Sequence, residues 1–249
     1  MALHRQTADL LSFLSSLGAP PLSQQSVEQA RAGYAAMRTI STVELAEVRD
    51  VDADGIACRL YRPTLDTTGV CVYFHGGGFV IGDLDSHDDV CRKLAVACGH
   101  AVIAVDYRLA PEHRFPAAVD DAIAATRWVR EHASELGCDP SRIAVAGDSA
   151  GGNLAAVVAI YAGVDLVFQL LIYPVTDARS TTQSYFDNAN GYFLTADTMR
   201  WFFMHYTGGD DSLVNDPRMS PLSATDVDLA ATPPAAVITA EYDPLRDEG

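Results

Sequence analysis

Gly147-Asp148-Ser149-Ala150-Gly151-Gly152 is the stretch that decides the fold. It follows an apolar run, 143–146, that is typical of a buried strand, and it opens an Ala- and Val-rich run, 153–160, that is typical of a helix. A serine among glycines at a strand-to-helix turn is held on a tight bend with its hydroxyl exposed, because only small neighbours allow the bend and the approach of a substrate. The stretch therefore predicts that Ser149 is a nucleophile.

The rest of the chain predicts helices and strands in alternation. The expected helices are 3–17, 23–39, 86–98, 117–136 and 150–161, and the expected strands are 43–49, 56–61, 70–74, 101–105, 142–146, 166–172 and 235–240. Short β-rich runs between longer helices imply a mostly parallel sheet covered on both faces. With 249 residues, 49% of them hydrophobic, the chain is long enough for one large α/β domain.

Three local patterns have a structural explanation that we prefer to a functional one. Asp52-Ala53-Asp54-Gly55 predicts a hairpin turn rather than half of a calcium loop, because Tyr61 stands where the bidentate glutamate belongs. His87-Asp88-Asp89 predicts the start of a helix, where acidic residues complement the dipole, rather than a metal site. The apolar stretch 154–175 predicts a helix, a turn and a strand instead of a membrane span, since Gly163 and Asp165 interrupt it.

Charge and cysteine content limit the partners and the compartment. A net charge of −16 argues against nucleic acid and anionic membrane surfaces, which would repel the chain. The five cysteines include no C-x-x-C pair, so we expect buried free thiols in a reducing, cytoplasmic compartment. We predict neither a metal nor another cofactor, and the assembly that we consider besides a monomer is a homodimer.

An aromatic-rich segment, 176–232, interrupts the alternation. Eight of the 21 aromatic residues lie within it, namely Tyr185, Phe186, Tyr192, Phe193, Trp201, Phe202, Phe203 and Tyr206. One interpretation is a lid that forms an apolar pocket over Ser149, with Phe79, Phe193 and Phe203 as candidate pocket residues; the alternative is ordinary packing of an inserted helical segment.

The nucleophile of an acyl-transfer site needs hydrogen-bond donors for the oxyanion. The amide of Ala150 directly follows Ser149, and the run His75-Gly76-Gly77-Gly78-Phe79 follows the strand 70–74. Glycines there let backbone amides approach a substrate oxygen. No Gly-Lys-Ser/Thr follows this run, which argues against a phosphate-binding loop.

Four separated motifs together resemble the hormone-sensitive-lipase-like branch of the α/β hydrolases. They are His75-Gly76-Gly77-Gly78, Asp106 to Glu112 with Phe115-Pro116-Ala117, Gly147-Asp148-Ser149-Ala150-Gly151, and Glu241 to Gly249. The resemblance runs from about residue 40 to the end of the chain. It implies an α/β-hydrolase fold and a carboxylesterase that acts on short- to medium-chain acyl esters, a small-molecule substrate.

The same resemblance implies roles for individual residues and a division of the chain. Asp243 would orient the catalytic histidine, and the amides of Gly77, Gly78 and Ala150 would form the oxyanion hole. The expected parts are N-terminal cap helices at 1–40, the core at 41–175, a cap insertion at 176–232, and a core strand with the start of a further helix at 233–249.

The histidine of the resembled triad has no counterpart at the expected place. The order in this fold is Ser, then Asp or Glu, then His, yet no histidine follows Asp243, and His205 lies in the expected lid. The turn at Ala162-Gly163 is also short. We therefore expect a biological protein longer than 249 residues, with a further helix, a last strand and the histidine beyond Gly249. A catalytically inactive small-molecule-binding protein on the same scaffold is the alternative.

Overall fold

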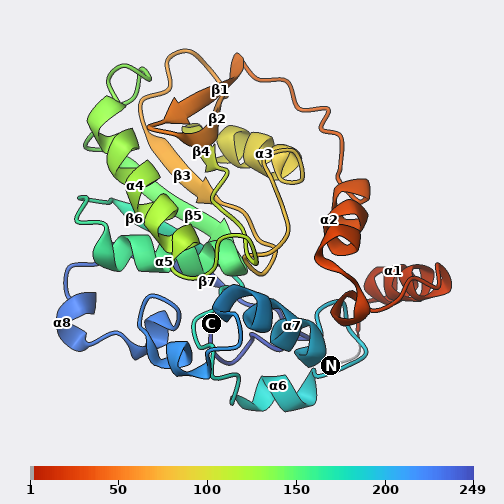
Figure 1. Cartoon of the computed structure of the whole chain (residues 1–249). Coiled ribbons are helices and arrows are strands. Elements are labelled where there is room, and N and C mark those ends of the chain that lie inside the picture. Colours follow the sequence, from red (N-terminus) through yellow and green to blue (C-terminus); the bar gives the residue numbers. More distant parts are fainter. Residues whose placement is uncertain (1–2) are drawn as a thin grey trace.

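A seven-stranded sheet forms the centre of the molecule in the computed structural model, which describes residues 3–249 (Figure 1). The strand order is β1-β2-β4-β3-β5-β6-β7, with β1 and β2 antiparallel to their neighbours and the other pairs parallel. The strands are β1 (Glu47–Ala53), β2 (Ile56–Arg62), β3 (Val70–Phe74), β4 (Ala101–Val105), β5 (Ile143–Asp148), β6 (Phe168–Ile172) and β7 (Ala235–Ile238). The predicted, mostly parallel α/β fold is confirmed.

Helices cover both faces of this sheet. The longer helices are α1 (Arg5–Ser16), α2 (Val27–Ala36), α3 (Asp88–Cys98), α4 (Ala117–His132), α5 (Ala150–Tyr161) and α7 (Ala196–Thr207). The short helices are η1 (Leu22–Gln24), α6 (Gln183–Asp187), η2 (Asp211–Asn215), η3 (Pro221–Ser223) and α8 (Asp226–Leu229). Helix α3 packs against β2 and β4, whereas α4 and α5 pack against each other and against β3.

Strand β3 shows how one short run of residues serves two cores. Val72 and Phe74 belong to the larger apolar cluster, which includes residues of α4 and α5, whereas Tyr73 belongs to a smaller cluster with residues of α3. This division follows from the period of two in a strand, because successive side chains point to opposite faces. All three side chains are fully or almost fully buried. A continuous apolar run therefore suits β3, since it is covered on both sides.

Several predicted elements are confirmed closely. Strands β1 and β2 form the expected hairpin, but β1 runs from Glu47 to Ala53 and not over the expected 43–49, because pairing continues to the turn. Asp54 and Gly55 have φ angles of 53° and 92°, and the Gly55 amide donates to Asp52 Oδ1 at 2.7 Å. Asp88 and Asp89 stand in the first turn of α3, as predicted. The apolar stretch 154–175 is divided between α5 and β6. In the described part of the chain, no helix combines the length and the apolar character that a bilayer crossing needs.

Other expectations were wrong in detail. The helix expected at 23–39 is broken into η1 and α2, because Ser26 caps α2 through a reciprocal pair of hydrogen bonds with Gln29. Residues 244–249 form hydrogen-bonded turns rather than the expected start of a helix.

The five cysteines are free thiols, as predicted, but not all are buried. Cys58, Cys91 and Cys138 are buried, Cys71 is half-buried, and Cys98 is exposed. Cys98 is the last residue of α3, directly before the left-handed Gly99 that ends the helix, and this position leaves it open to solvent.

The segments expected to form a cap gather at one end of the molecule. Figure 1 shows α6, α7 and α8 below the sheet, with α1 and α2 to one side of it. Helix α7 contacts η1, so the N-terminal segment and the insertion after β6 touch each other. Of the predicted cap segment 1–40, residues 1 and 2 lie outside the described part of the chain.

Candidate active site

The register of the sheet brings the sequence motifs to one edge. Phe74 pairs with Gly147, Asp148 pairs with Ile172, and Ile172 pairs with Ile238. Because these strands are parallel, the loops that follow β3, β5, β6 and β7 leave the sheet at the same carboxyl edge. This edge is where open α/β sheets bind ligands.

The bend that carries Ser149 has the expected strained geometry. The backbone of Ser149 has φ 55° and ψ −116°, a conformation that residues other than glycine rarely adopt. Hydrogen bonds fix it on both sides: its amide donates to Ile172 O at 2.9 Å, and its carbonyl accepts from Val175 N at 3.1 Å. A Cβ on Gly151 would lie 1.9 Å from Phe74 O, so only glycine lets α5 approach the end of β3.

The glycine run after β3 forms a tight turn beside this bend. Gly77 and Gly78 have φ angles of 127° and 59°, and a Cβ on Gly77 would lie 2.1 Å from Ile81 O. The amides of Val80 and Ile81 both donate to Gly77 O, whereas within residues 3–249 the amides of Gly77 and Gly78 have no acceptor. Ala150 is the first residue of α5, so its amide also has no intrahelical acceptor.

The glycine turn and the serine bend are joined by Asp148. Its Oδ1 accepts hydrogen bonds from Gly76 N at 2.9 Å and from the Tyr73 hydroxyl at 2.6 Å, and His87 Nε2 lies 3.6 Å away. Burial alone would raise the pKa of Asp148. The hydrogen bond and charge of His87, together with the Tyr73 hydroxyl, outweigh burial and lower this pKa below its usual value. Asp148 is therefore held as a carboxylate next to Ser149.

Asp243 lies beyond the end of β7, on the same edge. Its Oδ1 accepts from Leu245 N at 2.9 Å, and burial raises the pKa of its carboxyl. Burial, followed by the charges of Asp148 and Asp243, raises the pKa of Tyr173 to about 12. Tyr173, which follows β6, thus lies within electrostatic reach of both carboxylates, and our sequence analysis did not single it out.

The histidines of the described chain do not complete a triad. Within residues 3–249, neither Ser149 nor Asp243 is hydrogen-bonded to a histidine. His75 is buried and stacks on Tyr107 with ring centroids 4.3 Å apart; burial, with the nearby charge of His87, lowers the pKa of His75 to about 4. His205 packs edge-on against Trp201 in α7, in the segment expected to be a lid.

The three candidate pocket residues lie in different surroundings. Phe79 is 1% exposed and stacks on Tyr206 at 4.0 Å, Phe203 is half-buried, and the side chain of Phe193 is 70% exposed. Phe202, which the sequence analysis did not name as a pocket residue although it named its neighbour Phe203, is the aromatic ring that faces Gly78. A Cβ on Gly78 would lie 2.1 Å from the Phe202 ring, so α7 packs directly on this turn.

Comparison with known proteins agrees with this geometry. A family model described as the alpha/beta hydrolase fold matches residues 71–249. The chain belongs to the α/β-hydrolase family. The resemblance drawn from the four motifs is thereby confirmed.

Individual relatives are similar over most of this chain. It is 50% identical over 214 residues to the carboxylesterase NlhH of Mycobacterium tuberculosis (82% of this chain, 66% of the relative). It is 46% identical over 208 residues to the ethyl acetate hydrolase of Pseudomonas putida (80% and 64%). The chain thus spans just under two thirds of the length of these curated relatives. Among solved structures, a thermostable esterase from Pseudomonas putida ECU1011 superposes with a TM-score of 0.92 at 41% identity, covering 99% of this chain and 81% of the other.

Proposed function

We propose that this protein is a serine carboxylesterase that hydrolyses short- to medium-chain acyl esters through an acyl-enzyme intermediate. The observation that carries the proposal is the strained Ser149 bend next to a glycine turn whose amides are free to donate. The esterase names of the relatives support it and disfavour the alternative of an inactive binding protein.

Each proposed residue has a chemical role. Ser149 Oγ attacks the ester carbonyl, and the amides of Gly77, Gly78 and Ala150 bind the oxyanion that forms. A histidine base would take the proton of Ser149 and give it to the alcohol as this leaves, and water then releases the acyl group from the serine. Asp243 is the acid that would orient a histidine base. Glycine suits the first two amide positions because a side chain at either would collide with Ile81 O or Phe202.

We further propose that residues 1–40 and 176–232 form the cap over this site, around the core segments 41–175 and 233–249. The contact between α7 and η1 and the packing of Phe202 on Gly78 support this division. Phe202 joins Phe79, Phe193 and Phe203 as a candidate pocket residue. The free thiols support a reducing, cytoplasmic location. A homodimer stays a prediction, which light scattering after size-exclusion chromatography tests.

Hydrolysis of p-nitrophenyl butyrate tests the proposed function. The wild-type protein is expected to hydrolyse it, and Ser149→Ala is expected to lower kcat by about 10⁶-fold, as removal of a triad nucleophile does. Ser141→Ala, at an exposed serine ahead of β5, is the matched control and should keep wild-type activity. Equal turnover by Ser149→Ala and wild type would refute the proposal.

A further inference from the structure

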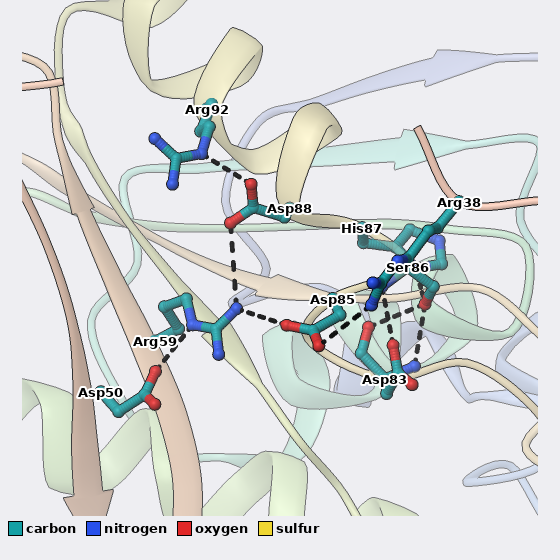
Figure 2. Close-up of polar contacts among 9 residues, drawn as sticks. All are labelled: Arg38, Asp50, Arg59, Asp83, Asp85, Ser86, His87, Asp88 and Arg92. Carbon is teal, nitrogen blue, oxygen red and sulfur yellow. Dashed lines mark hydrogen bonds and ion pairs between the residues drawn. The ribbon is translucent and has the colours of Figure 1, made fainter. Parts of the chain in front are cut away.

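The loop that precedes α3 presents a buried histidine to the active-site carboxylate. His87 is 5% exposed, and its Nε2 lies 3.6 Å from Asp148 Oδ1. Figure 2 shows the other end of its ring beside Ser86, with Nδ1 3.0 Å from Ser86 Oγ. Our sequence analysis assigned His87 only to the start of a helix, and the proposed mechanism does not use it.

Ser86 holds the Nδ1 side of the ring in place. Its Oγ accepts from Asp83 N at 2.9 Å, and its single hydroxyl hydrogen lies within reach of Asp83 O at 2.8 Å and of His87 Nδ1 at 3.0 Å. Both ring nitrogens of His87 therefore face polar partners, Nδ1 a hydroxyl and Nε2 a carboxylate.

The opposite nitrogen faces a carboxylate. If Nε2 of His87 lacked a hydrogen, its lone pair would point at Asp148 Oδ1, and the contact would be repulsive. The contact is favourable when Nε2 carries a hydrogen, so the geometry makes His87 a donor that faces Asp148.

Asp148 connects His87 to the glycine turn. The oxygen that faces His87 is the one that accepts from Gly76 N and from the Tyr73 hydroxyl. A Cβ on Gly76 would lie 2.2 Å from Asp148 Oδ2, so the carboxylate lies directly against the backbone that leads into Gly77 and Gly78.

We propose that His87 is a positioning residue, which acts through its contact with Asp148 to hold the Gly76 amide and thereby the oxyanion amides of Gly77 and Gly78. The inference rests on the proposed function for its effect on catalysis, but its structural part does not. His87 also packs against His75, with ring centroids 5.3 Å apart, so the test must separate action through Asp148 from packing on the start of the glycine run.

The loop that carries His87 is braced from outside, as this role requires. Asp85 lies between two arginines: Arg59 Nη1 donates to its Oδ1 at 2.8 Å, and Arg38 Nη1 lies 3.5 Å from its Oδ2 (Figure 2). Arg59 also donates to Asp50 of β1 at 2.6 Å. The loop is thereby tied to the hairpin and to the segment after α2.

Steady-state kinetics on p-nitrophenyl butyrate test the catalytic part. His87→Leu, which removes both ring nitrogens, is expected to lower kcat by about 10–100-fold while KM changes by less than about 3-fold, because misplaced oxyanion donors weaken transition-state binding. His87→Gln, which keeps a hydrogen-bond donor, should lose less. His113→Leu, at an exposed histidine, is the matched control and should behave as wild type.

A double-mutant cycle distinguishes action through Asp148 from an independent effect. The double variant His87→Gln with Asp148→Asn is expected to lose no more kcat than Asp148→Asn alone. A loss equal to the product of the two single losses would overturn the proposal, as would a kcat of His87→Leu within 2-fold of wild type. If His87→Leu does not fold, the cycle still decides the question.

Hydrogen exchange tests the structural part without turnover. Exchange of the Gly76 amide, measured in a peptide that spans 72–80, should be faster in His87→Gln than in wild type, whereas exchange in β4 should be unchanged. Unchanged exchange of the Gly76 amide would contradict the proposal whatever the activity. Inactivity of the wild-type protein, by contrast, would refute the proposed esterase function and leave the exchange result to decide the inference.

Discussion

Two mostly buried carboxylates differ in their hydrogen-bond partners. One is Asp148, next to the proposed nucleophile, and the other is Glu248, near the end of the described chain. The Asp148 side chain is 14% exposed, and Glu248 is 4% exposed. Asp148 Oδ1 faces a hydroxyl, an amide and a histidine. Glu248 Oε1 accepts only from the amides of Thr176 and Asp177, and among the described residues its buried Oε2 has no hydrogen-bond partner.

The pKa values of the two carboxyls shift in opposite directions. Burial raises the pKa of Glu248 to about 8, and its two amide hydrogen bonds only reduce the increase. The pKa of Asp148 is lowered despite burial, because His87 supplies a charged hydrogen-bond partner. A buried carboxylate is therefore kept charged where it has a cationic partner, and this happens next to the proposed nucleophile.

The largest expected effect comes from removing the carboxylate of Asp148. Asp148→Leu leaves the hydroxyl of Tyr73, the amide of Gly76 and the imidazole of His87 without their acceptor. We expect the free energy of unfolding to fall by about 3–5 kcal/mol, as when one partner of a buried charge pair is removed. Urea denaturation measures it, with Asp66→Leu at an exposed aspartate as the control. A loss no larger than that of the control would mean that the pair contributes little.

The second-largest expected effect is a pH dependence of the folding stability, which is due to Glu248. Its folded pKa, about 8, lies above the ordinary 4.5, so the native state holds the proton more tightly. The protonated carboxyl of Glu248 therefore contributes its full stabilisation of the folded state below about pH 4.5, and this contribution is lost as the pH rises through 8. The midpoint of thermal unfolding should therefore fall between pH 5 and 8 more steeply in wild type than in Glu248→Gln. Parallel curves for the two proteins would show that Glu248 is already ionised at pH 5.

The smallest effect is expected at a third, exposed carboxylate. Asp85 is paired with Arg38, and the two side chains are 56% and 51% exposed. Hydrogen bonding by Arg59 lowers the pKa of Asp85, but water screens both ion pairs. Arg38→Ala should lower the free energy of unfolding by less than about 1 kcal/mol, and 1 M NaCl should reduce the difference further. If Arg38→Ala lowered the free energy of unfolding as much as Asp148→Leu does, the contrast between buried and exposed pairs would be contradicted.

Much of the fold could be predicted from local patterns. The strands at 70–74 and 101–105 were predicted to the residue, because short β-rich runs bounded by polar or glycine residues leave little freedom. The hairpin turn at Asp54-Gly55 was also predicted, because Asp-Gly favours positive φ angles, but the first strand of the hairpin was predicted four residues too early. The break between η1 and α2 was missed because the cap at Ser26 lies inside a run that otherwise favours a helix.

The candidate site was predictable where it depends on single motifs and not where it depends on contacts between them. The sequence indicates Ser149 and the glycine run, but the hydrogen bond of Asp148 to Gly76 joins residues 72 positions apart. The pattern at His87 indicated only the start of a helix, and Tyr173 gave no pattern. Their places near Asp148 follow only from the loops that the parallel sheet brings together. Phe202 could not be separated from Trp201 and Phe203, because only the packing of α7 decides which ring meets Gly78.

The most direct test of the central claim is to label the wild-type protein with a fluorophosphonate ester and to identify the modified peptide by mass spectrometry. We expect one phosphonyl adduct, on Ser149, and none in Ser149→Ala, because only a serine that faces donors for the developing oxyanion reacts readily. An adduct on another serine, an unlabelled wild-type protein, or equal labelling of Ser149→Ala would contradict it.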